Sequence, residues 1–194
     1  MLDICATLLV RRSLCLTMKD RPCPMQIYTI GHSNHTQEKF LDLLAEAKIE
    51  VLVDVRSNPN SRWAAFANRD SLKEILESLQ IHYVYLGDVL GGRPSDSDSY
   101  DSQTGKADYQ AIQEKEYFRR GIKRILGGLK RYRMCIMCAE EDPTSCHRNL
   151  LVAESLRRSG VLVLHIRGDG RIQTDEELWK EKVGVVANQY QLSL

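Results

Sequence analysis

Short apolar blocks with two different periods follow one another along the chain. Five runs rich in apolar and β-branched residues predict β-strands, at residues 26–30, 51–55, 82–86, 134–139 and 161–166. Apolar residues that recur every three to four positions predict helices between and after them, at residues 36–47, 71–79, 109–132, 146–159 and from 175 onward.

Strands that alternate with helices indicate a parallel sheet with helices on both faces. We therefore expect an α/β fold, with a mainly parallel β-sheet in a single domain over residues 25–194. Residues 1–24 show little periodicity, so we expect a poorly ordered tail there. Residues 87–106 are mostly Gly, Pro, Ser and Asp, which predicts a long polar loop of the kind that often covers a binding site.

Potentially reactive side chains follow several predicted strands. Ligands of parallel α/β sheets bind beyond the carboxyl ends of the strands, so these side chains share one crevice if their strands are neighbours. The residues expected to supply acid, base or nucleophilic groups are His32, Asp54, Cys138, Glu140 and Cys146. The residues expected to bind substrate are Arg56, Arg62, Gly91, Gly92 and Arg148. In the alternative interpretation, Asp54 and Arg56 pair with loop backbone and His32 caps a helix.

The cysteines near the end of the chain allow more than one role. Cys146 begins a predicted helix beside His147, where the helix dipole and nearby cations lower a thiol pKa; otherwise it is a small buried residue. Cys138 fits a nucleophile, a partner thiol or the core, whereas Cys135 fits the core. Cys135 and Cys138 point to opposite faces of a strand, which disfavours a shared zinc ion. Cys138, Cys146 and His32 could still meet, but we assign no metal ligands.

Charge and motifs restrict the partners. The net charge of +1 indicates no particular class of partner. Residues 118–133, however, hold seven basic and no acidic residues, which fits either nucleic-acid binding or a solvated helix face. Residues 91–93 match neither phosphate-loop nor dinucleotide motifs, so we expect no cofactor. We see no membrane-spanning run, and the cysteine spacing favours the cytoplasm over a secreted disulfide scaffold. The sequence leaves the oligomeric state open.

Five motifs in order carry a family resemblance. They are residues 30–33 (IGHS), 53–56 (VDVR), 90–93 (LGGR), 137–140 (MCAE) and 146–148 (CHR). Together they resemble the bacterial and archaeal domain-of-unknown-function family 488 over about residues 27–182. The resemblance implies that the strand-end residues are the family's motif residues, and it implies no reaction. The chain is also loosely similar to rhodanese-type sulfurtransferases, although the segment 138–148 is longer than their single-cysteine loop.

These observations leave three functional hypotheses. The first is an enzyme acting on a nucleotide or nucleic-acid-related substrate, in which arginines hold phosphate or carboxylate. His32, Asp54 and Glu140 would supply the acid/base groups, and Cys138 or Cys146 the nucleophile. The second is a sulfurtransferase that carries a persulfide on Cys138 or Cys146. The third is a non-enzymatic nucleic-acid-binding module that uses residues 118–133.

Overall fold

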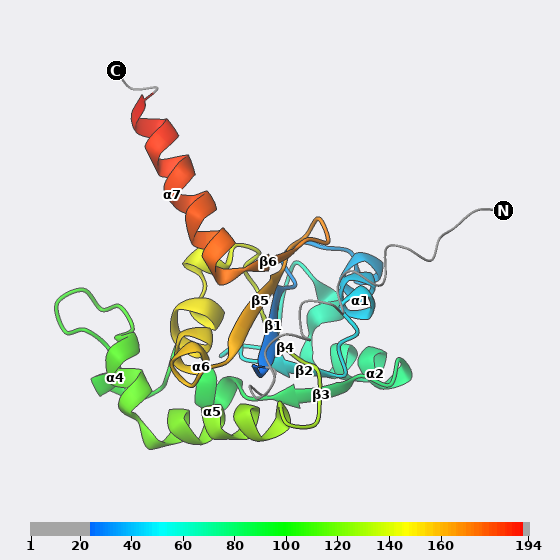
Figure 1. The fold of residues 1–194 in the computed structure, drawn as a ribbon. Helices are drawn as coiled ribbons and strands as arrows, with labels where there is room; N and C mark the ends of the chain where they lie inside the picture. The colour runs from blue at the N-terminus through cyan, green and yellow to red at the C-terminus, as the bar shows by residue number, and fades with distance from the viewer. Residues whose placement is uncertain (1–23, 192–194) are drawn as a thin grey trace, which may run out of the picture.

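The computed structural model describes residues 24–191, in which helices pack against both faces of one β-sheet (Figure 1). The strands are β1 Gln26–Gly31, β2 Val51–Asp54, β3 His82–Tyr85, β4 Met134–Cys138, β5 Leu162–Ile166 and β6 Ile172–Thr174. The α-helices are α1 Gln37–Glu46, α2 Arg69–Ser78, α3 Gly87–Leu90, α4 Tyr109–Glu114, α5 Glu116–Gly128, α6 Glu154–Arg158 and α7 Asp175–Gln191. Three-residue 3₁₀ turns are η2 Ala65–Ala67, η3 Ser97–Ser99 and η4 Pro143–Ser145, and η5 Arg148–Ala153 is π-helical.

The strand order of the sheet is β3-β2-β4-β1-β5-β6. Strands β1 to β5 run parallel, and β6 pairs antiparallel with β5. Strand β4 lies between β1 and β2, with Cys138 beside Gly31 and Met137 beside Asp54. The carboxyl ends of these three strands therefore meet at one edge of the sheet, as the strand-end argument requires.

Each face of the sheet has its own apolar core. On one face, α1 and α2 bury residues such as Phe40 and Leu72 against the sheet. On the other face, α5 and the η5–α6 segment bury Phe118, Ile125 and Leu151. The predicted α/β fold with a mainly parallel sheet and helices on both faces is confirmed.

Local sequence signals set several helix ends. The Thr36 side chain accepts a hydrogen bond from the backbone N–H of Lys39 and so caps α1. The Asp108 carboxylate does the same for α4, where it accepts from the backbone N–H groups of Gln110 and Ala111. Gly160 has a φ of +79° just after α6, a conformation in which glycine pays no steric penalty.

The structure differs from the sequence predictions in three segments. Residues 87–106 are not a loop throughout, because α3 opens them and its Leu90 is fully buried. The predicted helix at 109–132 is divided into α4 and α5 by Lys115, whose backbone is extended. Strand β6 was not predicted, since its three residues are too few to show a period.

Two further predictions concern membranes and the start of the chain. Within residues 24–191, none of the helices combines the length and apolar character needed to cross a bilayer. The predicted tail at residues 1–24 lies outside the described residues, apart from Pro24.

Candidate functional site

A cavity of about 360 Å³ lies at the carboxyl ends of β2 and β4. It is the place at which the strand-end argument predicts a ligand. Its walls come from the loops after β2 and β4, from the segment after α3, and from the start of α4 and η5. The lining residues are Arg56, Ser57, Asn58, Gly92, Arg93, Tyr109, Cys138, Ala139, Glu140, Ser145, Cys146 and His147.

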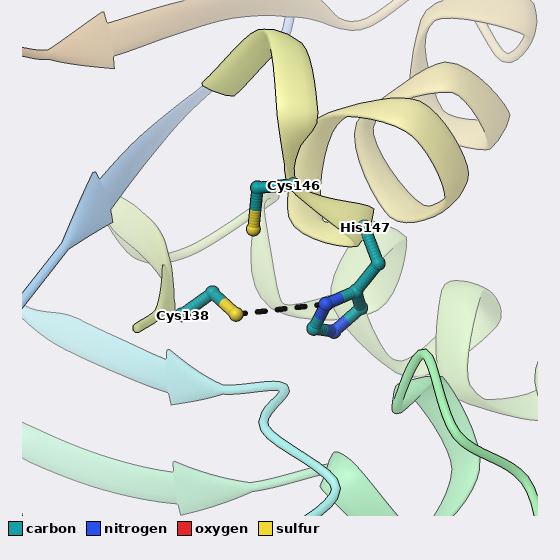
Figure 2. A group of neighbouring side chains, drawn as sticks. All are labelled: Cys138, Cys146 and His147. Atoms are coloured by element: carbon teal, nitrogen blue, oxygen red, sulfur yellow. Dashed lines mark hydrogen bonds between the residues drawn. The ribbon is translucent and has the colours of Figure 1, made fainter. Parts of the chain in front are cut away.

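Two thiols and an imidazole meet on one wall of this cavity (Figure 2). Cys138 ends β4, whereas Cys146 and His147 precede η5. The Cys138 Sγ lies 3.5 Å from Nδ1 of His147, and these atoms and the Cys146 Sγ all lie within 4.8 Å of one another. The sheet and the following helix thus bring Cys138 together with two residues that lie eight and nine positions later in the sequence.

The imidazole of His147 is held in one orientation. Its Nε2 lies 2.9 Å from the carbonyl oxygen of Val55. A carbonyl can only accept, so Nε2 donates, and the lone pair of the neutral ring is then on Nδ1, facing Cys138. Burial opposes the charged ring, but the contacts with Cys146 and the Val55 carbonyl outweigh it and raise the pKa of His147.

The carboxylate of Glu140 completes the cluster by contacting both thiols. Its Oε2 accepts from the Cys138 thiol at 3.1 Å and from the Cys146 thiol at 3.2 Å. Burial favours the neutral acid, yet these two hydrogen bonds lower the pKa of Glu140 below its ordinary value. The single proton of Cys138 therefore has two acceptors within reach, the Glu140 carboxylate and Nδ1 of His147.

The three described cysteines are buried, and burial affects the pKa of two of them. The hydrogen bond with Cys138 and burial raise the pKa of Cys146, the opposite of the lowering that its place before a helix predicts. The physical reason is that Cys146 is buried and shares its carboxylate acceptor with a second thiol. Burial also raises the pKa of Cys135, which lies in the core below the sheet edge, as expected.

Asp54 and Arg56 form a buried ion pair rather than an open acid/base site. Two hydrogen bonds join the carboxylate to the guanidinium, at 2.9 Å from Nε and 2.6 Å from Nη2. The Tyr83 hydroxyl donates to the same carboxylate at 2.7 Å, and Arg56 also donates to the Ala67 carbonyl. Asp54 has no exposed surface and does not line the cavity, so the acid/base role predicted for it does not fit its position.

Arg148 does not line the cavity, although the sequence prediction gave it a substrate-binding role. Its side chain is almost fully buried, and its guanidinium donates to the backbone carbonyls of Glu140 and Glu141. The residue fixes the loop that carries Glu140 between the two cysteines. Its guanidinium therefore stabilises the loop after β4 and does not face the cavity.

The remaining predicted residues divide between the site and its surroundings. His32 is buried next to the cluster, with Nδ1 3.0 Å from the Ser33 carbonyl, and its Nε2 has no hydrogen-bond partner within residues 24–191. Burial and the charge of Arg56 lower the pKa of His32.

Arg62 is exposed and lies away from the cavity wall. Gly92 lines the cavity, whereas Gly91 packs against Ser57.

Several lining residues were not predicted from the sequence. The most important is His147, which follows Cys146 directly and was treated only as a neighbouring cation. Its signal was the Cys-His pair at the start of a helix that follows a strand-end cysteine. The others not predicted are Ser57, Asn58, Arg93, Tyr109, Ala139 and Ser145.

The basic stretch at residues 118–133 lies apart from the cavity, mostly on α5. Arg120, Lys123 and Arg124 are exposed, and Arg119 pairs with Glu114. Arg133 is used internally, because its guanidinium stacks on the Tyr28 ring and donates to the Ala47 carbonyl. The exposed cations of α5 therefore form a separate surface.

Residues 36–155 match the model of a family described as Domain of unknown function DUF488. The matched span covers most of the chain and includes Cys138, Glu140, Cys146 and His147. It begins after the first motif, so His32 lies outside it. No curated protein and no solved structure matches the chain significantly, and the looser similarity to rhodanese-type sulfurtransferases stays a prediction.

Proposed function

The chain belongs to the family described as Domain of unknown function DUF488, and we propose that it is an enzyme that uses the Cys138 thiol as a nucleophile on a small substrate. The observation that carries the proposal is the 3.5 Å contact between the Cys138 Sγ and Nδ1 of His147 beside an open cavity. A nucleophile within reach of a base, with that base oriented by a third group, is typical of covalent catalysis. Here the third group is the Val55 carbonyl.

The reaction that this arrangement supports has two balanced halves. The Cys138 sulfur forms a bond to an electrophilic atom of the substrate while its proton passes to Nδ1 of His147. The bond to the leaving group breaks with its electron pair, and His147 returns the proton to that group. Water or an acceptor molecule then attacks the covalent intermediate and releases Cys138, so no oxidant or reductant is consumed.

The cavity wall supports a substrate with an anionic group. Its volume of about 360 Å³ is within the range of small-molecule sites. Arg93 lines it from the segment after α3, and the partly exposed rim also includes Ser57 and Asn58. Guanidinium and hydroxyl donors suit phosphate or carboxylate oxygens. A nucleotide or nucleotide-related molecule of this size remains our first substrate class.

Sulfur transfer is the second candidate, and the neighbouring Cys146 thiol favours it. In such a reaction, the Cys138 thiolate attacks the outer sulfur of a thiosulfonate or persulfide donor. The donor leaves as a sulfinate or thiolate, and Cys138 keeps one sulfane sulfur atom as a persulfide. A second thiol within 4.8 Å gives this sulfur an immediate acceptor.

Nucleic-acid binding through residues 118–133 is a separate proposal that rests on the exposed cations of α5. It predicts affinity for mixed-sequence oligonucleotides that falls steeply with added salt, because bound phosphates release counterions. Affinity that is insensitive to salt, or unchanged in an Arg120→Glu, Lys123→Glu variant, would contradict it.

Mass spectrometry of the intact protein tests the enzymatic proposal. The full chain is incubated with EDTA and either a chromogenic acetate ester or a thiosulfonate, and adducts are mapped by peptide analysis. An acyl group or an added sulfur atom on Cys138, absent from Cys138→Ser and kept in Cys135→Ala, is the expected result. The probe that reacts decides between the two reaction types. Adducts spread over all cysteines, or none on Cys138, would overturn the proposal.

A further inference from the structure

The three lining groups in Figure 2 are also the donors that zinc prefers. They are the Sγ atoms of Cys138 and Cys146 and the Nδ1 atom of His147, all within 4.8 Å of one another. Thiolate and imidazole donors favour Zn²⁺ over Mg²⁺ or Ca²⁺, which prefer oxygen. Cys138, Cys146 and His147 come from a strand end and the start of the next helix, two rigid elements.

The separation of Cys138 and His147 fits a tetrahedral ion, and Cys146 lies within 4.8 Å of both. Bonds of about 2.3 Å to sulfur and about 2.0 Å to nitrogen place tetrahedral donors roughly 3.5–3.8 Å apart. The Cys138 Sγ is 3.5 Å from Nδ1 of His147, so this pair needs no movement to share a metal.

The surroundings orient the imidazole as a metal ligand. A ligating histidine usually donates its other ring N–H to a carbonyl or carboxylate, which fixes the ring and frees the ligating nitrogen. His147 donates from Nε2 to the Val55 carbonyl at 2.9 Å. Gly92 also packs against His147, where a Cβ atom would lie 2.8 Å from Cγ and 3.2 Å from Nδ1 of the ring.

A fourth ligand is available, and the cavity can also supply an open position. The Oε2 atom of Glu140 lies 3.1 Å and 3.2 Å from the two sulfur atoms. It can approach an ion held between the sulfurs, or leave that place to water or substrate on the cavity side. Zinc sites with three protein ligands and one exchangeable position occur in enzymes, whereas four protein ligands are typical of structural sites.

We propose that Cys138, Cys146 and His147 form a zinc-binding site whose fourth position faces the cavity. Both thiols lose their protons to solvent when the ion binds. The inference does not depend on the proposed reaction, although it uses the same residues. A bound ion takes the Cys138 thiolate as a ligand, so zinc and an electrophilic substrate compete for that sulfur.

Metal titration of the full reduced chain tests this site. A Cys5→Ser, Cys15→Ser, Cys23→Ser background removes the thiols outside the described residues. Zn²⁺ affinity is then measured by competition with a chromophoric chelator. One ion per chain is expected, and His147→Gln or Cys146→Ser should weaken binding by roughly 100-fold or more, since direct ligands matter more than the orienting groups that change affinity 10- to 100-fold. Cys135→Ala is the matched control and should bind as the parent does.

Cobalt spectroscopy gives an independent reading that needs no substitution at the proposed ligands. Co²⁺ bound by thiolates in a tetrahedral site has intense visible absorption bands and a sulfur-to-metal charge-transfer band. Both are expected on the background chain and should disappear when Zn²⁺ is added. The absence of these bands, or Zn²⁺ affinity equal in His147→Gln and the parent, would overturn the metal site. Reactivity of Cys138 in EDTA tests the enzymatic proposal separately, so either proposal can fail alone.

Discussion

The Nε2 atom of His147 donates to the carbonyl oxygen of Val55, 2.9 Å away on the loop after β2. This bond connects the helix that carries His147 to the neighbouring strand of the sheet. It also decides which ring nitrogen faces the thiol of Cys138. Both the nucleophile and the metal interpretations of the site depend on that orientation.

Replacing Gly92 should disturb the orientation of His147 without unfolding the protein. A Cβ atom at this position would lie 2.8 Å from the Cβ and Cγ atoms of His147, so in Gly92→Ala the ring must move. Because small misplacements of catalytic groups cost about 100-fold, we expect Cys138 alkylation to slow by roughly 10- to 100-fold. The rate is measured by peptide mapping after timed exposure to iodoacetamide.

Gly127→Ala is the control for this variant. A Cβ atom there meets nothing within 4 Å, and the residue is exposed near the end of α5. It should leave the alkylation rate unchanged and raise stability by about 0.5–1 kcal/mol through helix propensity. Equal rates in Gly92→Ala and Gly127→Ala would show that the ring position does not matter.

Asp54→Asn should lower stability strongly, because it leaves the buried Arg56 guanidinium without its counter-charge. Breaking one partner of a buried ion pair typically costs about 3–5 kcal/mol. Tyr83→Phe removes only the hydroxyl that donates to Asp54 and should cost about 1 kcal/mol. Urea denaturation measures both changes. A stable Asp54→Asn protein that had lost activity would instead support the acid/base role predicted from sequence.

Variants at Arg148 and Arg93 should distinguish a residue that stabilises the fold from a residue that binds an anion. Arg148→Lys cannot donate to the Glu140 and Glu141 carbonyls with the same planar fork, so we expect a loss of about 1–3 kcal/mol of unfolding free energy.

Arg93→Ala, on the exposed cavity wall, should change stability by less than about 0.5 kcal/mol. Arg93→Ala should, however, weaken protection of Cys138 by inorganic phosphate. The reverse pattern would place the anion at Arg148.

Acidification should destabilise the protein through His165. This buried ring donates from Nε2 to the Asp175 carboxylate at 3.1 Å, and in its neutral form Nδ1 accepts from the Thr29 hydroxyl at 2.8 Å. Burial lowers the pKa of His165 below its ordinary value of 6.5, and the nearby arginines act in the same direction. The unfolded chain therefore binds the proton more readily, so stability is full above pH 6.5 and falls as the pH drops below it.

A variant isolates this contribution from those of other histidines. His165→Gln cannot titrate, so its unfolding free energy should decline less between neutral and mildly acidic pH than that of the parent. Thermal melts across that range give the comparison. An identical pH slope in both proteins would assign the acid sensitivity elsewhere, for example to buried His32, whose pKa is also lowered by burial.

The fold could be predicted because its signals are local. Periodic apolar runs defined β1 to β5, and alternation with helices implied a parallel sheet. The strand-end rule then brought Cys138, Glu140 and Cys146 to one place, since it requires only that β4 lie beside β1 and β2.

The roles of neighbouring residues could not be predicted in the same way. His147 and Arg148 are adjacent, but successive helix positions are about 100° apart, so only one of them faces the cavity. Which one depends on how the helix packs on the sheet. Likewise, the buried Asp54–Arg56 pair depends on the Tyr83 hydroxyl of β3 and on the Ala67 carbonyl of η2. Both lie outside the motif, so the residues around Asp54 and Arg56 do not predict how the pair is buried.

The most direct test of the central claim compares alkylation of Cys138 and Cys135 in one protein. The metal-free full chain is exposed to limiting iodoacetamide in EDTA, and each cysteine peptide is quantified over time. A base-assisted thiol beside a cavity should react at least about tenfold faster than a thiol buried in the core, and His147→Gln should remove most of that advantage. Equal rates for the two cysteines, or a Cys138 rate unaffected by His147→Gln, would contradict the proposed nucleophile.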